Sequence, residues 1–185
     1  MNYLFKICIV GLTFFLSLNA PLMAETKPLR IKITQGVIKP MPIALAQFSA
    51  LGDSSPAYVD QITSVIMADL VGSGLFREIP KSAHVSANTD FNMPVKFADW
   101  RVINADALIT GSVNIQGDKL ILQFRLFDVF AQKPLGEGLQ FQASTGNWRR
   151  MAHKISDAVY SRLTGETAYF DSKVVYISEQ GPKNA

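Results

Sequence analysis

The stretch ALITGSVNIQGDKLILQFRL, residues 107–126, decides the fold of this chain. In each half, apolar side chains recur at every second position, which is the period of a β-strand with one buried face. The Gly117-Asp118 pair between the halves is typical of a two-residue hairpin loop that begins with glycine. With that loop Ile115 lies opposite Leu120, and the following pairs bring both apolar faces to the same side of the hairpin.

Segments on both sides of this hairpin extend the sheet. A third alternating segment at residues 139–143 completes an antiparallel meander, and the apolar run at 42–48 is typical of a buried strand. Shorter strands are expected at 75–79 and at 173–178. These segments predict a mixed β-sheet of about five strands.

Two long helices are expected to cover one side of this sheet. The first begins with Ser55 as its N-cap and Pro56 at its first position. The second spans 147–164, carries a regular apolar stripe and ends at Gly165. A short helix is expected within 97–104. The predicted fold class is therefore α/β, or α+β-like, with the sheet packed against two long α-helices.

The composition is that of one globular domain. The chain has 185 residues, of which 48% are hydrophobic and 18% are charged. These values exclude intrinsic disorder and collagen-like repeats. The net charge is only +3, and apart from Arg149-Arg150 the basic residues are scattered. The charge pattern therefore gives no reason to expect a nucleic-acid partner.

Residues 1–24 predict an export signal. The apolar run at 7–18 is too short to span about 30 Å of hydrocarbon, but it fits the central region of a signal peptide. Cleavage is expected between Ala24 and Glu25, which predicts a periplasmic protein with no direct membrane insertion after processing. The alternative is an uncleaved amino-terminal anchor. The only cysteine, Cys8, lies inside the signal, so the processed chain can form no disulfide.

No catalytic or metal-binding pattern is evident in the sequence. The two histidines, His84 and His153, stand far apart, and neither belongs to a metal-ligand spacing. His84 is expected in a solvated loop, and His153 is expected to form a weak exposed pair with Asp157. The sequence thus predicts a binding module without catalytic residues, metal or cofactor.

The segment LRIKI, residues 29–33, alternates apolar and basic side chains and is followed by prolines at 40 and 42. Alternation of this kind is typical of a half-exposed strand. Two interpretations remain open. The segment is either an edge strand of the domain's own sheet or an arm that adds a strand to the sheet of another protein.

Several motifs resemble the amino-terminal domain of the TolB family. The longest match runs through residues 148–160 into Leu163-Thr164-Gly165-Glu166 and on to 168–177. The other matching segments are 42–44, 69–76, Trp100 with 106–111, and 125–129. The resemblance covers the whole chain after the signal, and it implies a periplasmic, non-catalytic scaffold of the Tol-Pal system. It further implies a role in outer-membrane invagination during cell division and in outer-membrane integrity.

The resemblance also implies partners. It makes the amino-terminal arm a binding segment for the TolA C-terminal domain, through Leu29, Arg30, Ile31, Lys32, Ile33, Gly36 and Val37. Thr34 and Ile38 depart from the family, in which acidic residues are common at these positions. Binding to Pal is implied only for a β-propeller that follows this domain in the family, and that propeller is missing from this chain.

The expected organisation is a signal peptide at 1–24, an arm or edge strand at 25–40, and an α/β domain at 41–168. Residues 169–185 are expected to form a linker and the start of the first propeller strand, where the chain is truncated. The alternative function is an independent periplasmic ligand-binding or envelope-assembly domain unrelated to Tol-Pal.

The export signal gives the first testable prediction. When the chain is expressed in a Gram-negative host, mass spectrometry of the exported protein should give a mass that begins at Glu25, because the signal ends in a small residue, Ala24. A mass that retains residues 1–24 would contradict the predicted cleavage and favour the uncleaved anchor.

Overall fold

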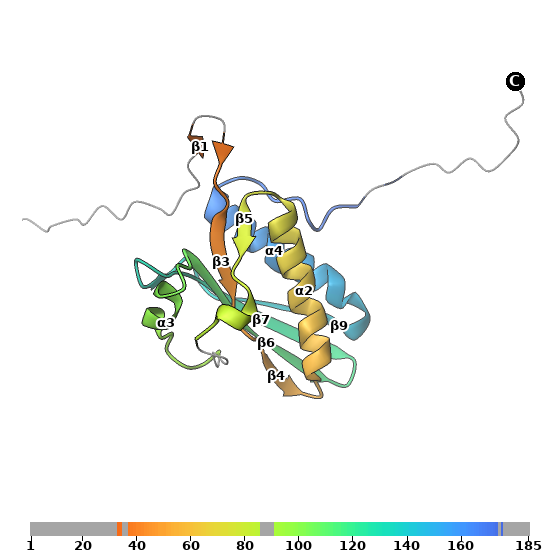
Figure 1. Cartoon of the computed structure of the whole chain (residues 1–185). Helices are drawn as coiled ribbons and strands as arrows, with labels where there is room; N and C mark the ends of the chain where they lie inside the picture. The colour runs from red at the N-terminus through yellow and green to blue at the C-terminus, as the bar shows by residue number, and fades with distance from the viewer. Residues whose placement is uncertain (1–32, 35–36, 86–90, 174, 176–185) are drawn as a thin grey trace, which may run out of the picture.

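A seven-stranded mixed sheet carries two long helices on one face (Figure 1). The computed structural model describes residues 33–34, 37–85, 91–173 and 175, so the predicted signal peptide with Ala24 and Glu25 lies outside the described residues. The strand order is β5-β3-β6-β7-β8, β4 also pairs with β6, and β9 also pairs with β7. The predicted mixed sheet with two long helices is confirmed.

The elements have the following bounds. The strands are β1 Ile33–Thr34, β2 Val37–Ile38, β3 Met41–Leu45, β4 Ser49–Gly52, β5 Phe76–Glu78, β6 Ala107–Gln116, β7 Lys119–Asp128, β8 Lys133–Pro134 and β9 Leu139–Ser144. The helices are α2 Pro56–Gly72, α3 Phe97–Arg101 and α4 Trp148–Thr164, with short 3₁₀ turns η2 Lys81–Ala83 and η3 Thr145–Asn147.

The β6–β7 hairpin has the predicted register. Ile115 pairs with Leu120, and the pairing runs without interruption to Ala107 and Asp128. Gly117 has a φ of 58°, the left-handed conformation that a glycine-first hairpin loop requires. Strand β9 pairs antiparallel with β7, which confirms the meander.

Strands β3 and β4 both lie parallel to β6, and β4 was not expected from the sequence. Three residues separate the two strands, and among them Phe48 is 2% exposed. A Cβ atom at Gly111 would lie 2.6 Å from the carbonyl oxygen of Gln123 and would clash with the Phe48 ring. Gly111 therefore leaves the space on β6 that the ring occupies.

The helix ends follow the expected capping chemistry. The Ser55 hydroxyl accepts a hydrogen bond from the backbone N–H of Tyr58, with Pro56 in the first turn of α2. Gly74 and Gly165 follow α2 and α4 with φ values of 75° and 79°. Both glycines adopt the left-handed conformation that commonly ends a helix.

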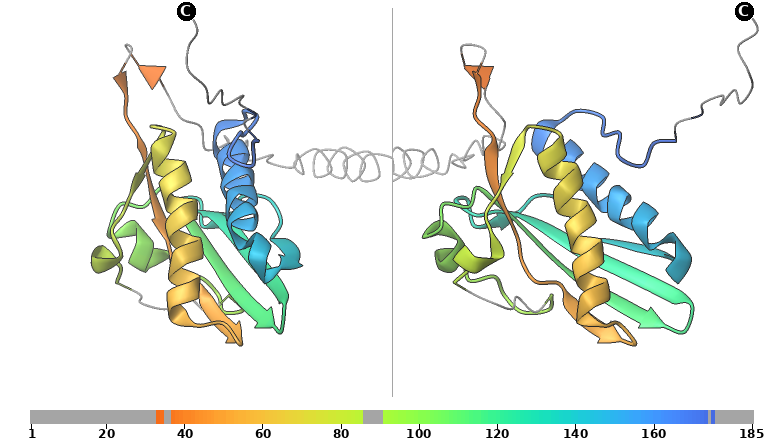
Figure 2. Two further views of the ribbon diagram at one scale, coloured as in Figure 1. Left: turned by 90° about the vertical axis from the view of Figure 1, so that its right-hand side faces the viewer. Right: turned by 45° about the vertical axis from the view of Figure 1, so that its right-hand side comes forward.

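The sheet has an apolar core on each face. The main core lies between the sheet and the two long helices, and its large members include Ile43, Ile62, Phe124, Ile155 and Leu163. On the other face, α3 and the loop before β6 cover a smaller core around Trp100, which is 1% exposed (Figure 2). The expectation that only one side of the sheet is covered was therefore wrong at this end of the domain.

The last predicted strand is not evident in the described part of the chain. Lys173 and Val175 belong to no helix or strand, and the rest of 173–178 lies outside the described residues. Within the described ranges, no helix combines the length and the apolar character needed to cross a membrane.

The contact between Phe48 and β6 gives the second prediction. Gly111→Ala should lower the free energy of unfolding by about 1–3 kcal/mol or more, because overpacking forces either the ring or the neighbouring strand to move. Gly146→Ala is the matched control, since a Cβ there meets no atom within 4 Å and should change stability by less than about 0.5 kcal/mol. Urea unfolding of both variants measures the difference, and equal stability would contradict the packing argument.

Candidate functional site

The predicted partner-binding arm lies only partly within the described residues. Outside them are Leu29, Arg30, Ile31, Lys32 and Gly36. Ile33 belongs to β1 and Val37 to β2, and the pairing sets Ile33 opposite Ile38 and Thr34 opposite Val37. In the described part of the chain this hairpin pairs with no strand of the main sheet, and it projects beyond the amino-terminal end of β3 (Figures 1 and 2).

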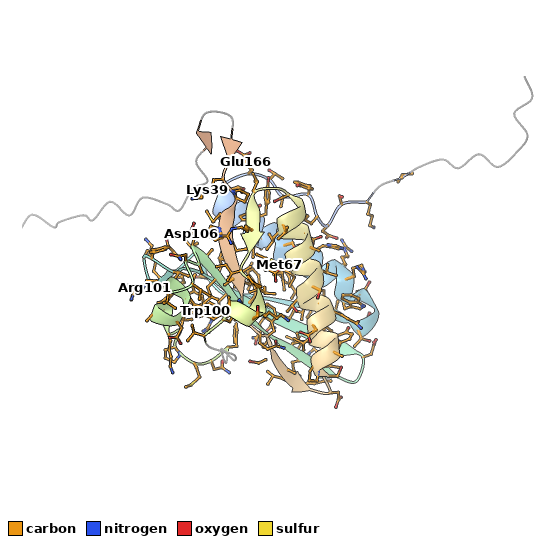
Figure 3. All side chains as sticks on the ribbon, in the orientation of Figure 1. Lys39, Met67, Trp100, Arg101, Asp106 and Glu166 are labelled. Atoms are coloured by element: carbon orange, nitrogen blue, oxygen red, sulfur yellow. The ribbon has the colours of Figure 1, made fainter. Side chains whose placement is uncertain are left out.

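Charged groups surround the base of the hairpin, where β3 and β6 begin (Figure 3). Burial raises the pKa of the Asp106 carboxyl, and the neighbouring Asp128 carboxylate raises it further. The positive charges of Arg77 and Lys39 act in the opposite direction. The backbone N–H of Asp106 donates to the carbonyl of Pro42 at 2.9 Å, which fixes the carboxyl beside the start of β3. The arm therefore leaves the domain next to a mixed-charge cluster.

A groove lies beside α2 at the edge of the sheet. It encloses about 300 Å³, and we call it the edge groove. Its lining residues are Leu45, Thr63, Ser64, Met67, Ala68, Val71, Glu78 and Lys81. The buried side chains of Leu45 and Met67 form its apolar base, and Figure 3 labels Met67. At its rim, the Lys81 ammonium donates to the Asp60 carboxylate at 2.8 Å, joining η2 to α2.

The two histidines have partners that the sequence did not predict. His153 Nδ1 lies 2.7 Å from Asp69 Oδ2, so the contact bridges α4 and α2. The predicted pair of His153 with Asp157 was wrong, because that spacing considered only neighbours on the same helix. His84 was expected to be solvated, but it packs against Trp100 and hydrogen-bonds to the carbonyl of Ile79.

The segment after α4 folds back onto that helix, and we call residues 168–171 the exit segment. The Asp157 carboxylate accepts hydrogen bonds from the backbone N–H groups of Phe170 at 2.8 Å and of Asp171 at 3.2 Å. The Asp171 carboxylate in turn lies 3.0 Å from Arg150 Nε and 3.4 Å from Lys154 Nζ. These contacts fix the direction in which the chain leaves the helix.

Aromatic rings complete this attachment. Tyr160 of α4 packs edge-on against Tyr169 and Phe170, with ring centroids 5.7 Å apart in both pairs. Phe76 of β5 contacts the same tyrosine ring. The exit segment is thus attached to the main core as well as to the charged face of α4.

The described residues hold no evident reaction centre. Within their ranges, no group of three His, Cys, Asp or Glu side chains is placed to bind a metal ion. The absence of catalytic residues, metal and cofactor stays a prediction. The features that stand out among the described residues are the projecting hairpin, the edge groove and the exit segment.

Comparisons of this chain with family models and with curated proteins agree on one family. Residues 29–135 match the family described as the TolB amino-terminal domain. The chain is 54% identical over 176 residues to a protein named Tol-Pal system protein TolB from Cereibacter sphaeroides, covering 95% of this chain and 40% of the relative. It is also 54% identical over 178 residues to the protein of that name from Dinoroseobacter shibae, of which it again covers 40%.

A solved structure supports the fold. The crystal structure of TolB from Acinetobacter baumannii superposes with a TM-score of 0.60 at 24% identity, covering 77% of this chain and 33% of that one. At this identity the likeness concerns the fold alone. The chain spans about 40% of the length of the curated relatives it matches.

The exit segment gives the third prediction. The hydrogen bond from Arg150, with further help from its charge and from Lys154, lowers the pKa of Asp171 from its ordinary value of 3.8. The ionised carboxylate therefore favours the attached segment, fully so above that ordinary value, and the contribution is lost as the pH falls through the lowered pKa. Asp171→Asn should remove it at every pH.

Hydrogen exchange at the backbone N–H of Phe170 measures this effect. At pH 7, Asp171→Asn should reduce its protection by up to about fivefold, the upper range of an exposed ion pair. Asp60→Asn is the matched control, because it removes an ion pair on α2 and leaves the exit segment untouched. A difference between wild type and Asp171→Asn that does not shrink as the pH falls below 3.8 would contradict the assignment to this carboxylate.

Proposed function

This chain belongs to the TolB amino-terminal domain family, and from that premise we propose that it acts as a non-catalytic scaffold domain of the Tol-Pal system. In this proposal the processed chain works in the periplasm, and its arm binds the C-terminal domain of TolA. Through that contact it supports outer-membrane invagination during cell division and outer-membrane integrity. The partner contact is built from the backbone of residues 29–33 and the side chains that alternate along it.

The observation that carries the proposal is the register of the β1–β2 hairpin. Ile33 pairs with Ile38, so one more step in the same register would set Lys32 opposite Lys39. The next step would set Ile31 opposite Pro40. Two lysines repel each other across a strand pair, and proline has no N–H to donate. In this proposal the hairpin pairing therefore stops at Ile33, and residues 29–32 pair with a partner strand.

The pattern of the arm suits strand addition. Leu29, Ile31 and Ile33 share one face of an extended segment and can fill alternating pockets beside a partner's edge strand. Arg30 and Lys32 project from the other face, where acidic groups of the partner would raise the association rate more than the final affinity.

The two departures from the family pattern fall within the hairpin. Thr34 pairs with Val37, and Ile38 pairs with Ile33. Threonine and isoleucine are β-branched and favour strands more than acidic residues do. In this chain Thr34 and Ile38 thus favour the hairpin at the base of the arm. Residues 29–32, which precede the hairpin, keep the alternation of apolar and basic side chains.

Removal of the arm is the direct test. Deleting residues 25–38 should abolish binding to the TolA C-terminal domain in calorimetry, while thermal unfolding stays close to that of the intact processed chain. The fold should survive because the main sheet begins at Met41. Normal binding by the deleted protein would contradict the arm. A collapse of its thermal stability would assign the segment to the domain's own sheet.

A single substitution sharpens the test. Ile31→Pro removes a backbone donor in the middle of the pairing and should weaken binding by about 1–3 kcal/mol, roughly fivefold to 150-fold in Kd. Ile31→Val is the matched control, because it keeps the donor and loses one methylene, worth about 0.8 kcal/mol at most. Equal effects of the two substitutions would contradict backbone pairing by the arm.

A further inference from the structure

The loop of the β1–β2 hairpin determines which backbone groups point outward from it. Thr34 pairs with Val37, and two residues separate them. A two-residue turn is closed by a hydrogen bond between its flanking residues, so Thr34 and Val37 form a hydrogen-bonded pair. Such pairs alternate along an antiparallel ladder with pairs that form no hydrogen bond, and Ile33 with Ile38 is the next pair. The N–H and C=O groups of Ile33 therefore point away from β2.

The β6–β7 hairpin of the same chain follows this rule. Its loop also has two residues, and Ile115 holds in β6 the position that Ile33 holds in β1. The carbonyl of Ile115 accepts a hydrogen bond from the backbone N–H of Asp53 at 2.9 Å, outside the hairpin. Two residues earlier, the carbonyl of Val113 accepts from the Ser54 hydroxyl at 3.0 Å. This outer edge of β6 is the edge to which β4 adds.

The outer edge of β2 is poorly suited to accept a strand. The backbone groups of Ile38 point outward, for the same reason as those of Ile33. In a continued strand the next outward position is Pro40, which has no N–H to donate. From Met41 onward the chain already pairs with β5. The outer edge of β2 thus ends after a single donor.

The outer edge of β1 can be longer, because no proline interrupts it. The residues that precede Ile33 at intervals of two are Ile31 and Leu29. In an extended arm, the N–H and C=O groups of both residues point to the same side as those of Ile33. Pro28 falls on the alternate set of positions, so its missing N–H takes no donor from this edge.

We propose that the partner strand adds to the outer edge of β1, through the backbone groups of Leu29, Ile31 and Ile33. This inference rests on the proposed contact between the arm and the TolA domain, and it names the edge of the arm that makes the contact. The partner strand, β1 and β2 then form three neighbouring strands with β1 in the middle. The backbone groups of Arg30 and Lys32 face away from the partner.

Two features of this arrangement follow from the hairpin. It holds for a parallel and for an antiparallel partner, because backbone groups alternate between the two sides of a strand in both cases. Pairing with β2 also holds Ile33 extended before the partner arrives. Binding therefore starts from a residue whose conformational entropy is already reduced, which favours affinity.

Hydrogen exchange at single backbone N–H groups is the direct test. It is measured by NMR on the processed chain, free and in complex with the TolA C-terminal domain. Binding should slow exchange at Ile31 and Ile33 at least about fivefold more than at Arg30 and Lys32, because only the first two donate to the partner. Greater slowing at Arg30 and Lys32 would assign the partner to the other edge of the arm and overturn the proposal.

Proline variants test the same alternation through affinity. Ile31→Pro should bind at least about fivefold more weakly than Ile31→Ala, because it loses a donor that faces the partner. Arg30→Pro should bind within about twofold of Arg30→Ala, because its lost N–H faces away. Each alanine variant lacks the same side chain as its proline counterpart, so each comparison isolates the backbone. A proline penalty that is equal at the two positions, or larger at position 30, would overturn the choice of edge.

The outcomes separate this inference from the proposed function. No binding by the unchanged chain would contradict both. Binding that slows exchange at Ile38 and not at Ile33 would retain the contact with the TolA domain but move it to β2, and would overturn only the choice of edge.

Discussion

The packing of Phe48 against Gly111 is the contact on which the rest of the domain depends. A side chain on β6 at this point would meet both the ring and the backbone of β7. Because glycine leaves that space, the chain can interrupt strand pairing after Leu45, bury an aromatic ring and pair with β6 again from Ser49 onward. This edge of the sheet is therefore built from two short strands, β3 and β4, and the segment between them buries the Phe48 side chain.

This interruption determines where the contact surfaces lie. Strand β5 covers only the first part of the edge, beside the base of the hairpin, and α2 runs back over the uncovered part. The arm and the edge groove consequently occupy different positions along one edge of the sheet. In the described residues the main sheet begins only at Met41, and the β1–β2 hairpin lies beyond it.

Local sequence signals predicted the local structure well. The alternation through residues 107–126 gave the register of the hairpin, and Ser55, Pro56 and Gly165 gave the helix ends. Strand β4 was missed because SALG has neither alternation nor β-branched residues, and its pairing depends on a strand more than sixty positions later. The periodicity of a single sequence cannot predict a pairing between two strands so far apart in the chain.

The candidate surfaces were predicted less completely, for the same reason. The arm could be proposed because its pattern lies within five consecutive residues. The pair of Asp69 with His153 joins positions 84 apart, and the edge groove draws on β3, α2, β5 and η2. These arrangements exist only once the helices are packed on the sheet. From the sequence alone, the residues that form these arrangements could be recognised at most as polar groups with no evident neighbour.

The sequence analysis predicted only one weak pair on the charged face of α4, but this face organises three carboxylates. Asp69 reaches it from α2, Asp171 from the exit segment, and Asp157 of the helix itself holds two backbone N–H groups. Each of the partly exposed ion pairs contributes little stability on its own. Their common effect is to direct the chain, because the exit segment leaves α4 at the end of the sheet where the β1–β2 hairpin projects (Figures 1 and 2). The β1–β2 hairpin and the exit segment thus lie at one end of the domain, and β4 and the β6–β7 loop lie at the opposite end.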